Sequence, residues 1–141
     1  MSLMGKVGFA FAAGSLAVGS MLGAGSANAA GLYAAIAVGN GGWTYGVSVN
    51  EASAEQARAT AIANCGYTDC DVLQTWANGC GALVESDTGV AAGSGPNRAE
   101  AERAAYENLG NITPTAPLAN LGSANLSGAW VVDVICTSNA R

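Results

Sequence analysis

The chain is 141 residues long and carries ten acidic against five basic side chains, with no histidine. Only 11% of its residues are charged, whereas average proteins have about 25%. The acidic balance argues against nucleic acid and anionic membrane surfaces as partners, because both present negatively charged phosphates. The absence of histidine argues against Ser–His–Asp and Cys–His catalysis and the commonest zinc sites.

The first 29 residues have the three parts of a secretory signal peptide. Lys6 precedes a short apolar stretch over Val7–Leu22, and small residues follow up to Ala27-Asn28-Ala29, an A-x-A cleavage site. A retained anchor is the alternative, but a spanning helix needs about 20 apolar residues and this stretch is shorter and rich in glycine. We therefore expect cleavage after Ala29. Residues 30–141 then form one secreted or envelope-located domain, with no membrane insertion after cleavage.

The predicted mature part begins with a β-β-α-β pattern. In order, we expect a strand at 32–38, a glycine-rich turn, a strand at 43–49, a helix at 53–65 and a strand at 71–77. Apolar and polar residues alternate from Trp43 onward, which is typical of a strand with one buried face. Ser53 and Gln56 have the spacing of a capping box at the helix start, and Gly66 is suited to end the helix.

The same pattern then repeats. We expect strands at 80–84 and 89–94, a helix at 97–109 and a strand at 130–136. Asn97 and Gly110 lie 44 residues after Ser53 and Gly66, at the matching ends of the second helix. Two unrelated amphipathic helices are the alternative, but the shared cap, alanine stripe and terminal glycine favour a duplication.

The predicted fold class is therefore α+β. It consists of two disulfide-stapled β-β-α-β repeats, with two helices packed on one antiparallel or mixed sheet. The repeats differ most at residues 111–127, which carry two prolines and no charge. We expect this segment to be a surface loop.

Several of these segments together resemble the exported "domain of unknown function 4189" family. The resemblance lies in the C-G-x-x-x-C turn at Cys65–Cys70, the C-G-A at Cys80–Ala82 and the final Trp130 and Cys136, and it covers nearly the whole mature chain. It implies an exported protein of the kind found in actinobacteria and other GC-rich bacteria, and it implies no activity or catalytic residue. The chain departs from the family at Asp71, where a basic residue is common, and in its long last loop.

The four cysteines indicate disulfides, because an even number in a small exported domain is typical of a disulfide framework. Four cysteines allow three pairings. Cys65 and Cys70 close a short loop after the first helix, and Cys80 and Cys136 lie at strand ends that flank the second repeat, which favours 65–70 and 80–136. A redox pair and a zinc site are the alternatives, but the spacing is not C-x-x-C and histidine is absent.

Trp43 and Tyr45 are the candidate partner-binding residues. An exposed aromatic pair can stack on a sugar or hold a protein partner. Core packing is the alternative for both, as it is for Trp76 and Trp130, because all four aromatics lie on predicted strands.

Two acidic pairs lie near predicted turns: Asp69 with Asp71, and Glu85 with Asp87. A hydrolase without histidine would need two of these acids in one cleft, with one of them buried. Solvated side chains are the alternative. The sequence predicts no catalytic residue, no metal ligand set and no cofactor motif.

The first function hypothesis is an exported, non-catalytic binding or interaction domain that acts at the cell envelope or outside the cell. Its partner would be a protein or an envelope glycan, contacted through Trp43, Tyr45 or residues 111–127. The alternatives are a histidine-free hydrolase with paired carboxylates and an envelope structural protein that self-associates.

Overall fold

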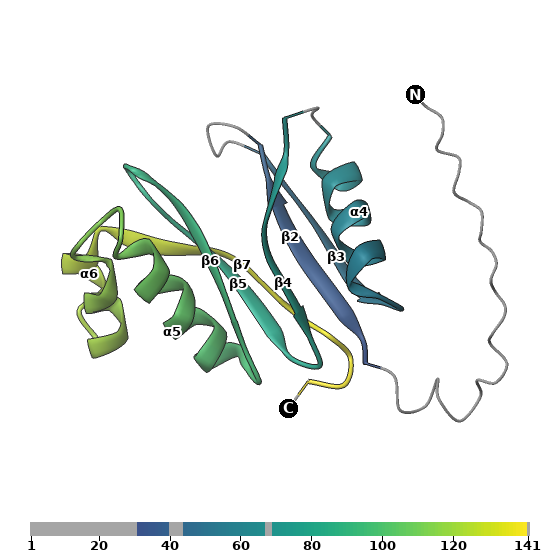
Figure 1. The fold of residues 1–141 in the computed structure, drawn as a ribbon. Helices are drawn as coiled ribbons and strands as arrows, with labels where there is room; N and C mark the ends of the chain where they lie inside the picture. Colours follow the sequence, from purple (N-terminus) through teal and green to yellow (C-terminus); the bar gives the residue numbers. More distant parts are fainter. Residues whose placement is uncertain (1–30, 40–43, 67–68, 141) are drawn as a thin grey trace, which may run out of the picture. The chain divides into compact units, whose positions relative to one another are not determined.

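The computed structural model describes residues 31–39, 44–66 and 69–140. Its strands are β2 (Tyr33–Val38), β3 (Tyr45–Glu51), β4 (Asp71–Ala77), β5 (Cys80–Ser86), β6 (Gly89–Gly95) and β7 (Ala129–Cys136). Its helices are α4 (Ala54–Cys65), α5 (Arg98–Leu109), the 3-10 helix η2 (Ala116–Leu121) and the short α6 (Ala124–Ser127), as Figure 1 shows. The expected signal peptide lies outside the described residues and stays a prediction.

The first repeat is an antiparallel sheet in the order β3-β2-β4, with α4 on one face. Ala35 and Ala37 of β2 point toward α4, and these small side chains let the helix lie close to the sheet. The approach is closest at Gly46 on β3, where an added Cβ would clash with the backbone of Ala61 and Cys65. A glycine is therefore required at this position.

The second repeat has the same strand order, β6-β5-β7, and carries α5. Two details beyond the predicted pattern also recur. Asn64 on α4 and Asn108 on α5 each donate a side-chain hydrogen bond of 2.8 Å to a carbonyl of the adjacent β3 or β6. The pairing with the last strand also shifts register once in each repeat, after Ile36 in β2 and after Leu83 in β5. These matches support the duplication.

Both helices begin where the sequence predicts a cap. The Oγ of Ser53 accepts the backbone N–H of Gln56 at 3.1 Å, and the Oδ1 of Asn97 accepts that of Glu100 at 3.0 Å. Each bond satisfies one of the four backbone donors that a helix start leaves free.

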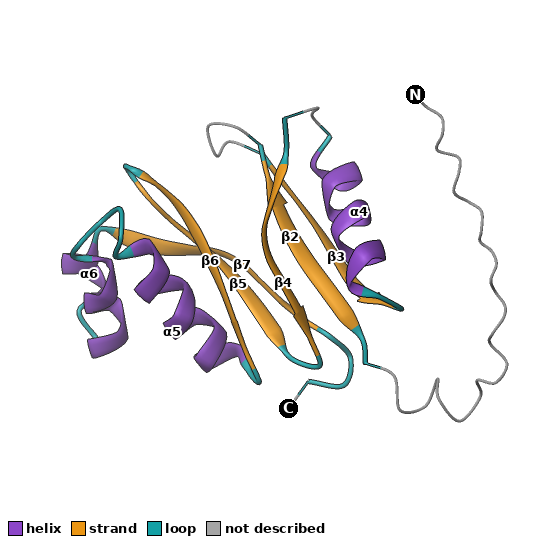
Figure 2. Ribbon diagram, viewed as in Figure 1, coloured by secondary structure: helices purple, strands orange, loops and turns teal. Residues whose placement is uncertain are grey.

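The expectation of a single sheet is wrong, because the six strands form two three-stranded sheets. Ile36 and Trp76 of the first sheet share a core cluster with Leu83 and Ala92 of the second. The sheets thus pack face to face, and α4 and α5 lie on the two outer faces (Figure 2). One sheet with both helices on the same face would leave this second set of apolar side chains in water, whereas stacking the sheets buries it.

Residues 111–127, predicted as a surface loop, contain η2 and α6 and are partly buried. Ala116 is fully buried in the core cluster under α5. The helix ends explain the difference between the repeats. Gly66 adopts a left-handed conformation (φ 86°) that ends α4, whereas Gly110 stays right-handed (φ −58°), so the chain continues from α5 into further turns.

Candidate functional site

The predicted disulfides are confirmed: Cys65 is bonded to Cys70, and Cys80 to Cys136. Cys80 and Cys136 are directly opposite each other on β5 and β7, with their Cα atoms 4.0 Å apart. Because all four cysteines are bonded, none is available as a thiol nucleophile or a metal ligand. Their role is to hold the scaffold on which any site is built.

Tyr45 begins β3, is 38% exposed and joins the two sheets. Its hydroxyl donates to the Oδ2 of Asp133 on β7 at 3.2 Å. Burial, followed by the negative charge of Asp133 and the hydrogen bond to it, raises the pKa of Tyr45 above its usual value of 10.0. The phenol is therefore a neutral donor at neutral pH. Trp43 lies outside the described residues, so the predicted Trp43–Tyr45 pair stays a prediction.

Trp130 lies on the same side of β7 as Asp133, because a register shift between them pairs Trp130 with Glu85 and Asp133 with Leu83, two positions apart on β5. Its neighbour Ala129 packs in the cluster under α5, so alternation turns Trp130 toward the first sheet. It is 46% exposed, whereas Trp76 is buried and donates its indole N–H to the carbonyl of Gly79 at 3.1 Å. Core packing is therefore confirmed for Trp76 and wrong for Trp130, although each lies on an outermost strand of its three-stranded sheet, β4 and β7 respectively.

The sequence analysis did not select Asp133 or Trp130. A signal was present, because Asp133 is the one charged residue within the apolar stretch of β7. A charge in an otherwise apolar strand indicates an edge or a position with a polar partner.

The four acids of the hydrolase alternative are all at least partly exposed. Asp69, Asp71 and Asp87 are exposed, and Glu85 is intermediate. That alternative requires one buried acid in a shared cleft, and none of the four is buried.

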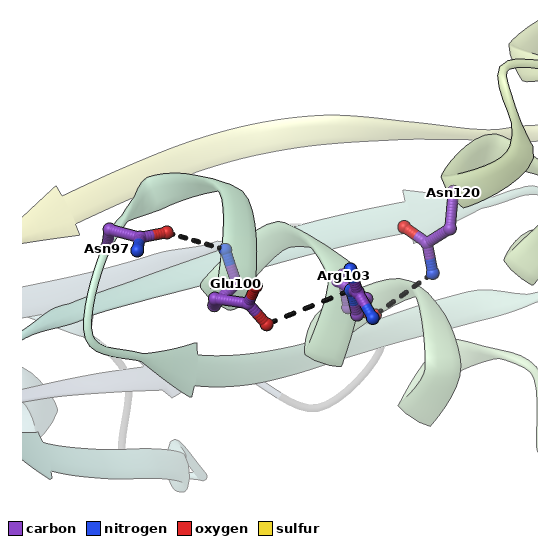
Figure 3. A network of polar contacts seen from close by, with 4 residues as sticks. All are labelled: Asn97, Glu100, Arg103 and Asn120. Carbon is purple, nitrogen blue, oxygen red and sulfur yellow. Dashed lines mark hydrogen bonds and ion pairs between the residues drawn. The ribbon is translucent and has the colours of Figure 1, made fainter.

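An open cavity of about 310 Å³ lies between α5 and η2. It is lined by Arg103, Glu107, Pro117, Asn120 and Leu121. The Nε of Arg103 lies 3.8 Å from Glu100 Oε1, and the Asn120 side chain donates to the Arg103 carbonyl at 3.3 Å. Figure 3 shows these contacts along α5 and η2. The sequence analysis missed this cavity because one of its walls is a helix in a segment predicted as a loop.

Aliphatic side chains project from the same segment. Leu121 is 78% exposed, Leu126 is 71% exposed and Ile112 is 50% exposed. No charged residue lies between 111 and 127. The segment thus offers an apolar, uncharged surface with a hollow beside it.

Within residues 31–39, 44–66 and 69–140, no three His, Cys, Asp or Glu side chains gather in a group that could hold a metal ion. In the same part of the chain, no helix has both the length and the apolar character needed to cross a membrane.

The fold and the cystines thus define a duplicated, disulfide-bonded α+β domain. The family model described as "Domain of unknown function (DUF4189)" matches residues 33–117, and the chain belongs to this family. The matched region ends within η2, so it is narrower than the sequence resemblance and does not include β7.

Two curated relatives are "Protein Rv1269c" of Mycobacterium tuberculosis (strain ATCC 25618 / H37Rv) and "Protein Mb1300c" of Mycobacterium bovis. Each is 44% identical to this chain over 85 residues, which is 60% of the chain and 66% of the relative. No solved structure matches the chain.

Proposed function

We propose that this protein is an exported, non-catalytic binding domain that acts at the cell envelope or outside the cell. Two observations support export: the basic, apolar and small-residue order of the first 29 residues, and the two disulfides, which are typical of proteins that fold outside the reducing cytoplasm. A small domain that is cross-linked twice is a rigid scaffold for a contact surface.

The exposed aliphatic surface at residues 111–127 carries the binding proposal. Leu121 and Leu126 are the most exposed large apolar side chains of the described residues. Leu121 also lines the cavity beside α5. Exposed aliphatic side chains beside a hollow favour a protein partner, because apolar contacts and a filled pocket are typical of protein interfaces.

An envelope glycan is the alternative partner for this surface. Sugars are commonly held by aromatic rings, and residues 111–127 contain no aromatic side chain. A protein partner is therefore favoured here. The hydrolase alternative is not favoured, because none of its four candidate acids is buried.

Site-specific photo-crosslinking in the producing cell tests the proposal. A photo-crosslinking amino acid replaces Leu121 in one strain and Ile62 in the other. Ile62 is the matched control, because it is an exposed aliphatic residue on α4, away from the segment. We expect a discrete cross-linked partner from position 121 in the envelope or medium fraction, and none from position 62.

Three results contradict the proposal. The same cross-links from both positions indicate no selective surface, and cross-links only between copies of the chain indicate an envelope structural protein.

Mass spectrometry of the recovered protein checks export separately. We expect the N-terminus at Ala30 and cystines at 65–70 and 80–136, and an intact leader or free thiols would refute export.

A further inference from the structure

We propose that the end of the inter-sheet face marked by Tyr45 and Trp130 binds a basic peptide segment of a protein partner. This inference goes beyond the proposed function, because it uses no residue of the 111–127 segment and names the chemistry of the ligand. The surface consists of two aromatic and three acidic side chains and is called the aromatic–acidic surface below. Its members are Tyr45, Trp130, Asp71, Glu85 and Asp133.

Two members lie in one row across the first sheet. Val38 on β2 pairs with Tyr45 on β3 and with Asp71 on β4. Directly paired residues point to the same face, and Val38 is buried in the core between the sheets. Tyr45 and Asp71 therefore lie at the margin of the inter-sheet face, two strand spacings or about 10 Å apart.

A matching row crosses the second sheet. Glu85 on β5 pairs with Trp130 on β7 and with Val90 on β6. Val90 packs against the same inter-sheet core as Val38, so this row also faces the other sheet. The hydrogen bond from Tyr45 to Asp133, three residues beyond Trp130, brings the aromatic ends of the two rows to the same side.

The negative charge of this surface is not compensated. Among residues 31–39, 44–66 and 69–140, the one ion pair joins Arg103 to Glu100. The arginines in this part of the chain lie on α4 and α5, which cover the outer faces. Within the described residues, Asp71, Glu85 and Asp133 thus have no basic partner. Their field attracts cations, and the exposed Trp130 ring adds a face on which ammonium or guanidinium groups can rest.

The spacing of the acids favours an extended basic chain over a small cation. A single ammonium group interacts closely only with carboxylates within about 4 Å. The three acids lie on three different strands: Asp71 on β4 of the first sheet, and Glu85 on β5 and Asp133 on β7 of the second. A peptide with several lysine or arginine side chains can pair with all three acids at once.

An NMR titration of the oxidised full chain tests this proposal, with the indole N–H signal of Trp130 as the readout. The probe is a blocked hexa-arginine peptide at low ionic strength, where charge pairing is least screened. Hexa-glutamate and chitohexaose are the comparison ligands, the first for charge sign and the second for a sugar. We expect only hexa-arginine to shift the Trp130 signal.

Matched charge variants separate this site from a general effect of the acidic chain. Asp71→Asn with Glu85→Gln should weaken hexa-arginine binding about fivefold. Glu55→Gln with Glu102→Gln removes the same charge from α4 and α5 on the outer faces and should weaken it less than about twofold. Trp130→Ala lacks the indole signal, so its titration is followed through the backbone amide signals of β5 and β7. It should weaken binding about two- to fivefold, as expected for loss of an exposed cation–π contact.

Three results would overturn the inference. Equal losses in the two charge variants would indicate an effect of net charge alone. An unmoved Trp130 signal would place binding elsewhere, and a shift with chitohexaose but not with hexa-arginine would indicate a sugar surface. None of these results bears on cross-linking from Leu121, so the two proposals can fail separately.

Discussion

The bond between Cys80 and Cys136 should stabilise this domain about twice as much as the bond between Cys65 and Cys70. The first joins residues 56 positions apart in sequence, and the second joins residues 5 apart. A cross-link removes conformational entropy from the unfolded chain, and the removed entropy grows with the logarithm of the loop length. At these lengths the expected stabilisation is about 4 kcal/mol for 80–136 and about 2 kcal/mol for 65–70.

Each pair is the matched control for the other. The variants are C80A with C136A, and C65A with C70A, so that no unpaired thiol remains in the altered pair. Each double variant also removes sulfur atoms from a buried cluster, since Cys80, Cys65 and Cys70 are all buried. The packing losses are therefore similar, and the difference of about 2 kcal/mol between the variants reports the loop length.

Urea unfolding of the oxidised proteins, followed by far-UV circular dichroism, measures both losses. Calorimetry provides a second measure, because about 1 kcal/mol corresponds to about 4 °C in a domain of this size. The 80–136 variant should then melt about 8 °C below the 65–70 variant. Equal losses, or a larger loss for the 65–70 variant, would refute the conclusion that closing the second repeat is the main contribution of the cystines.

Three further predictions concern the fold. Gly46→Ala should cost about 2–3 kcal/mol in urea unfolding, because the added Cβ meets the backbone of α4, which no change of rotamer can relieve. Gly89→Ala is its control and should be nearly neutral, because that Cβ meets only a side chain at 3.4 Å; equal costs would contradict the close approach of α4. Asn97→Ala should cost about 1 kcal/mol by removing the cap of α5, whereas Asn97→Ser should keep most of it, and equal unfolding midpoints would disprove the cap. Folding raises the pKa of Tyr45, so the unfolded chain releases the phenol proton at lower pH than the folded chain. The stabilisation by the protonated Tyr45 is therefore complete below pH 10.0 and is lost as pH rises above it. In urea titrations at alkaline pH, Tyr45→Phe should lose less stability than the unchanged protein, and the same pH dependence in both proteins would contradict this prediction.

Local signals correctly predicted the six strands and the two long helices of the described residues, but not η2 and α6. The residues Ser53 and Asn97 mark the helix starts, because their side chains satisfy backbone groups within the same turn. The order of the elements also favoured the cystine pairs that the structure shows, since the four cysteines lie at ends of strands and of one helix. Such signals depend on neighbours along the chain and can be recognised without knowledge of the tertiary packing.

The aromatic residues are the clearest case of what local signals do not decide. Trp76 and Trp130 both lie in strands with similar apolar patterns, yet Trp76 is buried and Trp130 is half-exposed. Alternation predicts which residues share a face of a sheet, and it does not predict whether another layer covers that face. The sequence named Tyr45 and residues 111–127 as candidate contacts but not the side chains beside them, because Tyr45 meets Asp133 across two sheets and 88 positions of sequence.

The sequence by itself determined the two β-β-α-β repeats and their helix caps and favoured one of three cysteine pairings, because each of these depends on residues close together along the chain or on the order of elements. Only the tertiary structure decided that the strands form two stacked sheets, that residues 111–127 fold into short helices beside α5, and that aromatic and acidic side chains meet at one end of the inter-sheet face. Those features arise from the burial of apolar faces against distant partners, and the periodicity of a single strand does not identify the partner.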